Sequence, residues 1–136
     1  MTRLTKDKVL ALQKAVAKRT GKDAPAPDAA ALEAALAAPF ARGADGADVF
    51  PSREERAAKL GYELAAKRVF GADGARMAMA VTLVFLEANG LAVDAPHDEV
   101  VVTARALANR RLRYDDLLAW ICRNATGYVW EKENVI

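Results

Sequence analysis

Apolar residues recur every three or four positions over most of the chain, which is the spacing of one face of a helix. The first such stripe consists of Val9, Leu12 and Val16. Thr5 stands where the N-cap of this helix is needed, and Gly21 stands where a helix commonly ends. The pattern therefore predicts a first helix between Thr5 and Gly21.

Two further helices are marked by their capping residues. Asp28 is suited to begin a short alanine- and leucine-rich helix, which Pro39 closes. Ser52 and Glu55 have the spacing of a capping box, in which each side chain accepts a hydrogen bond from the other residue's backbone N–H. We expect the helix that they begin to run to about Phe70, where a glycine-containing turn follows.

The segment after that turn is apolar on every side. No charged residue occurs between Arg76 and Glu87, and Asn89-Gly90 marks the end of the helix. A helix without a polar face is typical of a buried position. We therefore expect a central, buried helix over about 75–89, more fully removed from solvent than any other. A short extended piece is predicted over 91–93.

Two more helices complete the pattern, one beginning at Pro96 and one over the sequence YDDLLAWICR. Strand-favouring residues are sparse, and there is no internal repeat or low-complexity linker. The chain is predicted to form one all-α domain, a compact bundle of about six helices around the helix over about 75–89. The domain spans 1–136, with its core over about 4–125 and a C-terminal tail over 126–136.

The charge and composition of the chain argue against several classes of function. The chain has 20 Lys and Arg against 18 Asp and Glu, so its formal charge is +2. That balance argues against general nucleic-acid binding, which depends on phosphate neutralisation. A single cysteine excludes an internal disulfide and fits a reducing compartment. The N-terminus has no apolar signal core, and the longest uncharged apolar run is too short to span a bilayer. We expect a cytoplasmic protein without membrane contact.

The turn before the central helix, within RVFGADGARMA, holds the residues of most chemical interest. Glycines there allow a ligand to approach the backbone, and the helix that follows offers free N–H groups and the positive end of its dipole. Arg76 adds a planar donor. The candidates for binding a phosphate, a nucleotide or another anion are Gly71, Asp73, Gly74, Ala75 and Arg76. The alternative is a plain helix–helix turn in which Arg76 pairs with a nearby acid.

With its elements placed, the sequence resembles the death-on-curing (Doc) branch of the Fic superfamily. The resemblance rests on five segments in the same order and spacing: LTKDKVLALQKAV, DAAALEAALAAPF, REERAAKLGYELA, VTLVFLEANGLAVDAP and LRYDDLLAWI. Together they cover the chain from about Leu4 to Ala125. The resemblance implies a Fic/Doc-like fold, with the turn after Phe70 at the place of the family's active site.

The family's motif, HxFx[DE][GA]NxRxA, is only partly present. Its structural positions are matched by Phe70, Arg76 and Ala78. Arg68 replaces the histidine, which is a general base in the family, and a guanidinium stays protonated. Ala72 replaces the metal-binding acid and offers no oxygen to Mg²⁺, and Gly74 replaces the nucleotide-holding asparagine.

The resemblance therefore implies a site without an intact catalytic residue. Asp73 lies one position after the acid of the motif, so it would reach the metal only if the loop shifted, and it is a weak candidate for a metal ligand. No cofactor and no bound Mg²⁺ are expected. Weak nucleotide or phosphate binding stays open.

Doc proteins are toxins that pair with a small antitoxin, whose C-terminal segment folds as a helix into a groove of the Fic domain. We expect this chain to be a Doc-like toxin homologue with a degenerate site that binds a small antitoxin-like partner or acts in regulation. The groove is expected to be apolar and to lie beside the turn, on the side of the first helices. Arg68 and Arg76 at its rim would favour an acidic partner helix.

Two other functions stay open. One is an active transferase that moves a phosphate or a nucleotide monophosphate from a nucleotide to a protein hydroxyl, with altered site residues. The other is a structural or dimerisation domain. A homo-oligomer is compatible with each of these functions.

Three further features have simpler interpretations. His97 is expected in the solvent-facing first turn of a helix, and Cys122 is expected in the core. The basic cluster over Asn109–Arg113 is expected to be a solvated loop and helix end. Its alternative role is contact with an acidic partner or with DNA.

Overall fold

The computed structural model describes residues 1–21, 25–72 and 74–127. In these ranges the elements are, in order, α1 (Lys6–Thr20), α2 (Ala29–Ala37), the 3₁₀ helix η1 (Ala38–Phe40), α3 (Arg53–Ala66), α4 (Ala75–Ala88), β1 (Leu91–Val93), α5 (His97–Ala108), α6 (Tyr114–Asn124) and β2 (Ala125–Gly127). The predicted bundle of about six helices is confirmed. Asp73 and residues 128–136 of the predicted tail lie outside the described residues.

The predicted capping residues begin and end helices as expected. Thr5 and Asp28 each accept a hydrogen bond from a first-turn N–H, at 3.2 and 3.0 Å. Ser52 and Glu55 form the complete capping box at the start of α3. Gly21 ends α1 with a φ of +69°, a left-handed conformation that glycine adopts without a steric penalty. These local signals fix where the helices begin.

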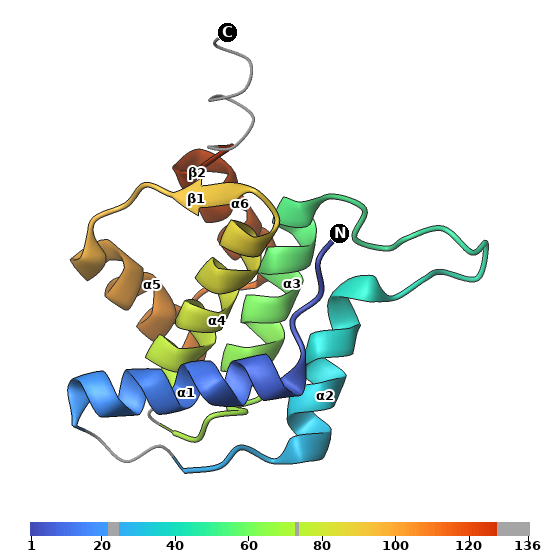
Figure 1. Cartoon of the computed structure of the whole chain (residues 1–136). Helices are drawn as coiled ribbons and strands as arrows, with labels where there is room; N and C mark the ends of the chain where they lie inside the picture. Colours follow the sequence, from blue (N-terminus) through green and yellow to red (C-terminus); the bar gives the residue numbers. More distant parts are fainter. Residues whose placement is uncertain (22–24, 73, 128–136) are drawn as a thin grey trace, which may run out of the picture.

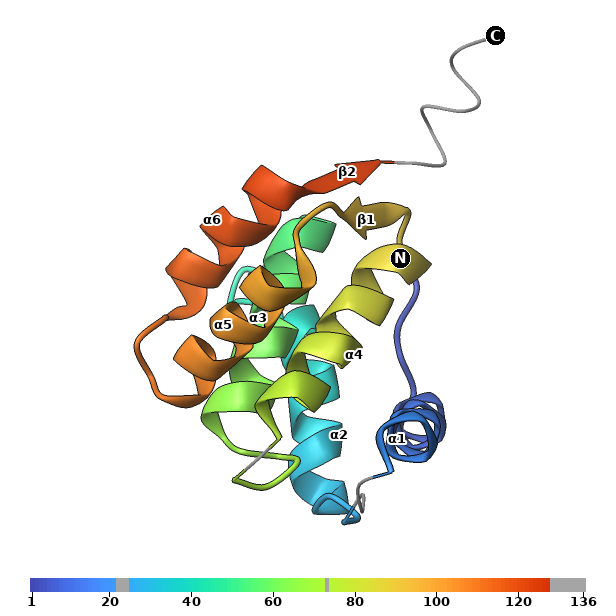
Figure 2. The same ribbon diagram turned by 90° about the vertical axis from the view of Figure 1, so that its left-hand side faces the viewer.

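Helices α3 and α4 lie side by side at the centre of the bundle, and α1 crosses its outside (Figures 1 and 2). The burial predicted for α4 is confirmed, because no residue between Met77 and Leu86 is exposed. The expectation that it is the most buried helix is wrong, since every residue of α3 is buried or half-buried, whereas Arg76, Glu87 and Ala88 of α4 are exposed. Its polar Arg56 and Glu63 are buried too, so the sequence pattern made α3 look more like a surface helix than it is.

The close packing of α3 depends on Gly61. A β-carbon at Gly61 would lie 2.6 Å from Oγ1 of Thr82 in α4 and 3.0 Å from a methyl group of Leu117 in α6. Both distances are shorter than a van der Waals contact, so a side chain at this position would push α3 away from its neighbours. The Thr82 hydroxyl is itself held by a 2.8 Å hydrogen bond that it donates to the carbonyl of Ala78.

The end of α3 differs from the prediction. The helix stops at Ala66 rather than at about Phe70, because Arg68 takes a left-handed φ of +49°. The N–H groups of Arg68 and Val69 donate back to carbonyls in the last turn of α3, at 3.2 and 3.1 Å, in the pattern of a Schellman motif. Glycine usually occupies this left-handed position, so an arginine there carried no stop signal.

The chain after α4 contains a short antiparallel strand pair. Leu91 lies opposite Gly127 and Val93 lies opposite Ala125, which confirms the extended piece predicted over 91–93. The first two residues of the expected tail, Thr126 and Gly127, are paired with Ala92 and Leu91 in this strand pair. In the part of the chain that is described, no helix has both the length and the apolarity needed to cross a bilayer.

Two single-residue expectations have opposite outcomes. His97 is exposed in the first turn of α5, as expected. Cys122 is also exposed, so the prediction of a core thiol is wrong. The inner face of α6 is taken by Leu117, Trp120 and Ile121, which leaves Cys122 on its outer side.

The buried face of α4 can be tested by a pair of leucine variants. Leu86 is fully buried and Leu83 is half-buried. Leu86→Ala is expected to lower the free energy of unfolding by about 2–5 kcal/mol, because apolar contacts are lost and a cavity is left. Leu83→Ala should lower it by less, since part of that side chain is already in water. Urea denaturation of both variants measures the difference, and equal losses would contradict this placement of α4.

Candidate functional site

The turn between α3 and α4 places the predicted site residues at the surface of one end of the bundle. Arg68, Ala72 and Arg76 are exposed, and so is Gly71, whereas Gly74 and Ala75 are half-buried. Phe70 and Ala78, the structural positions of the motif, are buried and anchor the turn. Asp73, the weak candidate for a metal ligand, lies outside the described residues.

The backbone at Gly74 leaves no room for a side chain. A β-carbon there would lie 2.6 Å from Cβ of Phe70 and 2.8 Å from both the carbonyl carbon and the carbonyl oxygen of that residue. Two of these three atoms belong to the backbone, which cannot move aside as a flexible side chain does. The position that holds an asparagine in the family motif is therefore closed in this turn.

Backbone N–H groups remain at the start of α4. Gly74 is the N-cap and provides no side-chain hydrogen bond. Within the described ranges, the N–H groups of Ala75 and Arg76 have no hydrogen-bond acceptor. Free N–H groups and the positive end of the helix dipole favour an anion at such a place. The described residues contain no group of three His, Cys, Asp or Glu side chains that could hold a metal ion.

Cations gather at this end of the molecule, where α3 and α5 finish and α4 and α6 begin (Figure 2). We call this region the basic end. Its cations come from the segments 63–76 and 109–116 and are Lys67, Arg68, Arg76, Arg110, Arg111 and Arg113. The acids described in the same segments are Glu63, Asp115 and Asp116. The excess of positive charge makes this end attractive to anions, although the whole chain is nearly neutral.

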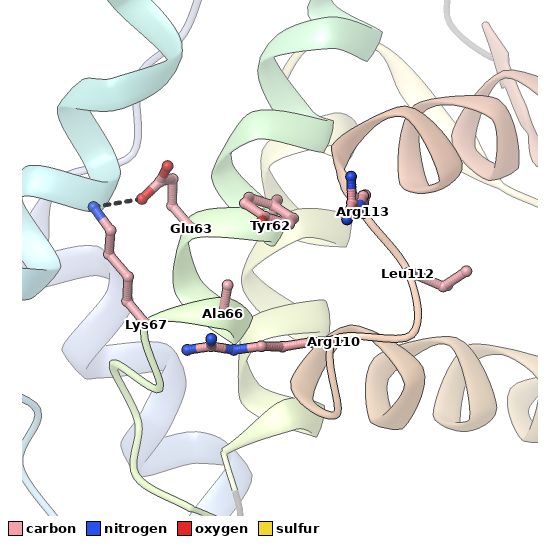
Figure 3. A pocket seen from close by; sticks show the side chains of 7 residues that line it. All are labelled: Tyr62, Glu63, Ala66, Lys67, Arg110, Leu112 and Arg113. Atoms are coloured by element: carbon pink, nitrogen blue, oxygen red, sulfur yellow. Dashed lines mark ion pairs between the residues drawn. The ribbon is translucent and has the colours of Figure 1, made fainter.

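A hollow of about 440 Å³ opens at the basic end, on the side of the α5–α6 corner (Figure 3). Tyr62 and Ala66 line it from α3, and Arg110 and Arg113 line it from the corner. The other lining residues are Glu63, Lys67 and Leu112. The hollow therefore joins residues that lie more than forty positions apart in the sequence.

Glu63 is the buried acid of this hollow, and it is held by two lysines. Its carboxylate oxygens lie 2.6 Å from Nζ of Lys59 and 2.7 Å from Nζ of Lys67. Burial alone would raise the pKa of the Glu63 carboxyl, but the hydrogen bonds and charges of Lys59 and Lys67 outweigh burial and hold the pKa below its ordinary value. Glu63 is thus a neutralised structural anion rather than a proton acceptor at neutral pH.

Arg110 reaches the hollow from a strained backbone position. Its φ is +59°, in the left-handed region. The N–H groups of Arg110 and Arg111 donate to the carbonyls of Leu107 and Ala106, at 3.1 and 2.9 Å. This is a second Schellman motif with an arginine at the usual place of glycine. Helices α3 and α5 therefore both end in a left-handed arginine at the basic end.

A second hollow, of about 180 Å³, has a structural explanation. It is lined by Met1, Arg3, Phe40, Arg42, Asp48 and Arg56. The guanidinium carbons of Arg3 and Arg56 lie 4.0 and 4.7 Å from the centre of the Phe40 ring. Arg56 also donates to the carbonyl of Phe50 at 2.7 Å and pairs with Asp48 at 3.1 Å. These contacts attach the first residues of the chain to α3.

The apolar groove expected on the side of the first helices stays a prediction. The larger hollow is lined from α3 and from the α5–α6 corner, and four of its seven lining residues are charged. In the ribbon, that corner and α1 lie on opposite sides of the bundle (Figure 2). In the described part of the chain, the large exposed apolar residues are Met1, Val49 and Val102, which lie at the N-terminus, in the loop before α3 and on α5.

Sequence reasoning missed most of the hollow. The cluster over Asn109–Arg113 was visible as a basic sequence and was interpreted as a solvated loop. Tyr62 and Lys67 had no signal of their own, because each is an ordinary residue within a helical pattern. Comparison with protein-family models gave no match for this chain, and comparison with curated proteins gave none either.

The closed position at Gly74 predicts how the turn responds to substitution. Gly74→Asn is expected to destabilise the protein by about 1–3 kcal/mol, because the new side chain overpacks against the backbone of Phe70. Ala72→Asp, which restores the acid of the motif at an exposed position, should leave stability nearly unchanged. Thermal melts of the two variants provide the comparison. A Gly74→Asn protein as stable as the parent would mean that the turn is more open than described.

The ion pairs of Glu63 predict a dependence of stability on pH. Because the folded-state pKa of Glu63 lies below its ordinary value of 4.5, its contribution is present above that value and is lost as pH falls through the lowered pKa. Glu63→Gln is expected to cost about 1.5–3 kcal/mol at neutral pH, the value of hydrogen bonds to charged groups. This difference should shrink in acid.

Chemical denaturation at several pH values measures the effect. Glu33→Gln is the control, since Glu33 is an exposed acid paired with a lysine at 3.4 Å and should have little effect at any pH. A loss for Glu63→Gln that does not change with pH would contradict the ion-pair explanation.

Proposed function

We propose that this chain is a Doc-like binding protein whose turn no longer carries out group transfer and whose partner is a small antitoxin-like protein. The proposal takes its family from the resemblance of five segments in order and spacing. The proposed mode of action, binding without group transfer, is supported by the geometry of the turn and by the positive charge around it.

The observation that carries the proposal is the closed backbone at Gly74. The family's asparagine has no room there, so the loss of the motif involves the path of the backbone as well as the identity of the side chains. Arg68 stays protonated and cannot act as a base, and Ala72 offers no metal ligand. A general base alone contributes about 10²–10⁴-fold to a rate, so its loss argues for a silent site.

Binding does not need the lost groups. Arg68 and Arg76 are exposed and have no ion pair within the described part of the chain. An acidic helix laid beside the turn would complement both charges and the start of α4. Such a segment is expected to be disordered alone and to fold on binding. The partner is therefore expected to be acidic where it meets the turn.

A second candidate function rests on the N–H groups of Ala75 and Arg76, which have no acceptor among the described residues. They favour weak binding of a phosphate or a nucleotide at the same turn. This candidate does not require transfer, and it is compatible with competition between a nucleotide and the partner helix.

The test combines a transfer assay with binding measurements. Protein incubated with labelled ATP, Mg²⁺ and a cell lysate is expected to label no other protein above background. A small protein that copurifies from native cells should bind through an acidic segment, and a peptide of that segment should raise the melting temperature. The double variant Arg68→Glu, Arg76→Glu should weaken the binding of this peptide at least about tenfold, a change in binding free energy of about 1.4 kcal/mol.

Arg123→Glu is the matched control, because Arg123 is exposed at the far end of α6. Equal weakening by the control would show that only total charge matters. A labelled target protein that disappears with Arg76→Ala would instead establish an active transferase.

A further inference from the structure

We propose that the hollow between α3 and the α5–α6 corner is a second binding site, which takes a phosphate monoester attached to a small apolar or aromatic group. This inference goes beyond the proposed function, because the hollow opens on the side away from α1 and uses different residues from the turn. It does not depend on the chain's being Doc-like.

The size of the hollow fits a small organic ligand. Its volume of about 440 Å³ lies within the range of about 300–1,000 Å³ that is usual for ligand pockets. Tyr62 and Ala66 lie at its centre, between Glu63 and Lys67 on one side and the α5–α6 corner on the other, from which Arg110 extends below Ala66 (Figure 3). The space is larger than an inorganic ion needs, so a ligand that fills it has an organic part.

The charges of the hollow select an anion. Lys67 is paired with Glu63, but Arg110 and Arg113 have no carboxylate partner among the described residues. Glu63 does not repel an incoming anion strongly, because two lysines neutralise it at 2.6 and 2.7 Å. A guanidinium presents a planar pair of donors that matches phosphate oxygens. Two unpaired arginines at one hollow therefore favour a doubly charged phosphate monoester.

The backbone at Arg110 is an independent observation in favour of a site. A φ of +59° is unfavourable for a residue with a β-carbon, and glycine would hold the same turn with less strain. The strained residue is an arginine that lines the hollow. Strain of this kind clusters at ligand-binding positions. Arg68 ends α3 in the same conformation, but of these two strained arginines Arg110 is the one that lines the hollow.

The apolar part of the hollow defines the rest of the ligand. Tyr62 and Leu112 are half-buried, so part of each side chain is available to a ligand. A flat or apolar group would pack on them while the phosphate reaches the arginines. An extended nucleic-acid strand suits this site less well, because it carries singly charged diesters and the chain as a whole is nearly neutral.

Isothermal titration calorimetry of the whole chain at low salt tests the proposal. Phenyl phosphate is the probe, with inorganic phosphate and phenol as its two halves. Phenyl phosphate is expected to bind saturably and at least about tenfold more tightly than either half, a difference of about 1.4 kcal/mol. Arg113→Ala and Tyr62→Ala should each weaken the binding of phenyl phosphate. Arg111→Ala is the matched control, since Arg111 lies in the same exposed corner but does not line the hollow.

Arg110→Gly separates binding from folding. Glycine removes the strain at φ +59°, so the melting temperature should rise while the affinity for phenyl phosphate falls at least about tenfold. A variant that is more stable and binds less supports the site. A variant that binds phenyl phosphate as well as the parent overturns it.

The phosphate monoester could belong to a metabolite or to a phosphorylated side chain, and two further titrations distinguish these sources. A short phosphotyrosine peptide that binds more tightly than phenyl phosphate, with the same loss in Arg113→Ala, assigns a protein source. Equal or weaker binding of the peptide assigns a small molecule. The proposal would be overturned if a single-stranded oligonucleotide bound more tightly than either probe. It would also be overturned if Arg111→Ala and Arg113→Ala lost equal affinity for phenyl phosphate.

Discussion

The close approach of α3 to α4 and α6 at Gly61 is the constraint on which the rest of the structure depends. A β-carbon there would meet Thr82 and Leu117 at 2.6 and 3.0 Å, so only glycine allows the three helices to pack at this distance. The packing fixes the direction in which α3 ends. Within the next six residues the chain places Glu63 and Lys67 at the hollow, and it then enters the turn to α4. Both candidate sites are therefore positioned by one contact in the core.

The two candidate sites differ in the groups that they offer to a ligand. At the turn, the side chains that the family motif needs are replaced, and the backbone at Gly74 is closed against one of them. What remains is a surface with exposed arginines and with N–H groups at the start of α4 that find no acceptor in the described part of the chain. At the hollow, arginines stand at the edge of a concave, partly apolar surface. One site is thus defined by what its backbone excludes, and the other by which side chains the tertiary fold brings together.

Local signals account for what the sequence predicted well. Thr5, Asp28 and the pair Ser52 and Glu55 act within one turn of themselves, so each helix start was visible in the pattern. The end of α3 was missed because arginine took the left-handed place of glycine. The burial of α3 was underestimated because Arg56 and Glu63 are inside with partners from other segments or turns. The hollow was not predictable, since Tyr62 and Arg110 meet only through packing.

The alternating directions of the helices have a consequence for how partners arrive. Two helices finish and two begin at the basic end, so the dipole of α4 acts only on groups in contact with its first turn, and the field at longer range comes mainly from side chains. Six of the 20 basic residues of the chain lie in the two segments that form the basic end, against three described acids, so this end carries a local excess of positive charge. An acidic partner is turned toward that end before it touches the protein. Added salt should therefore slow the encounter more than it shortens the life of the docked complex.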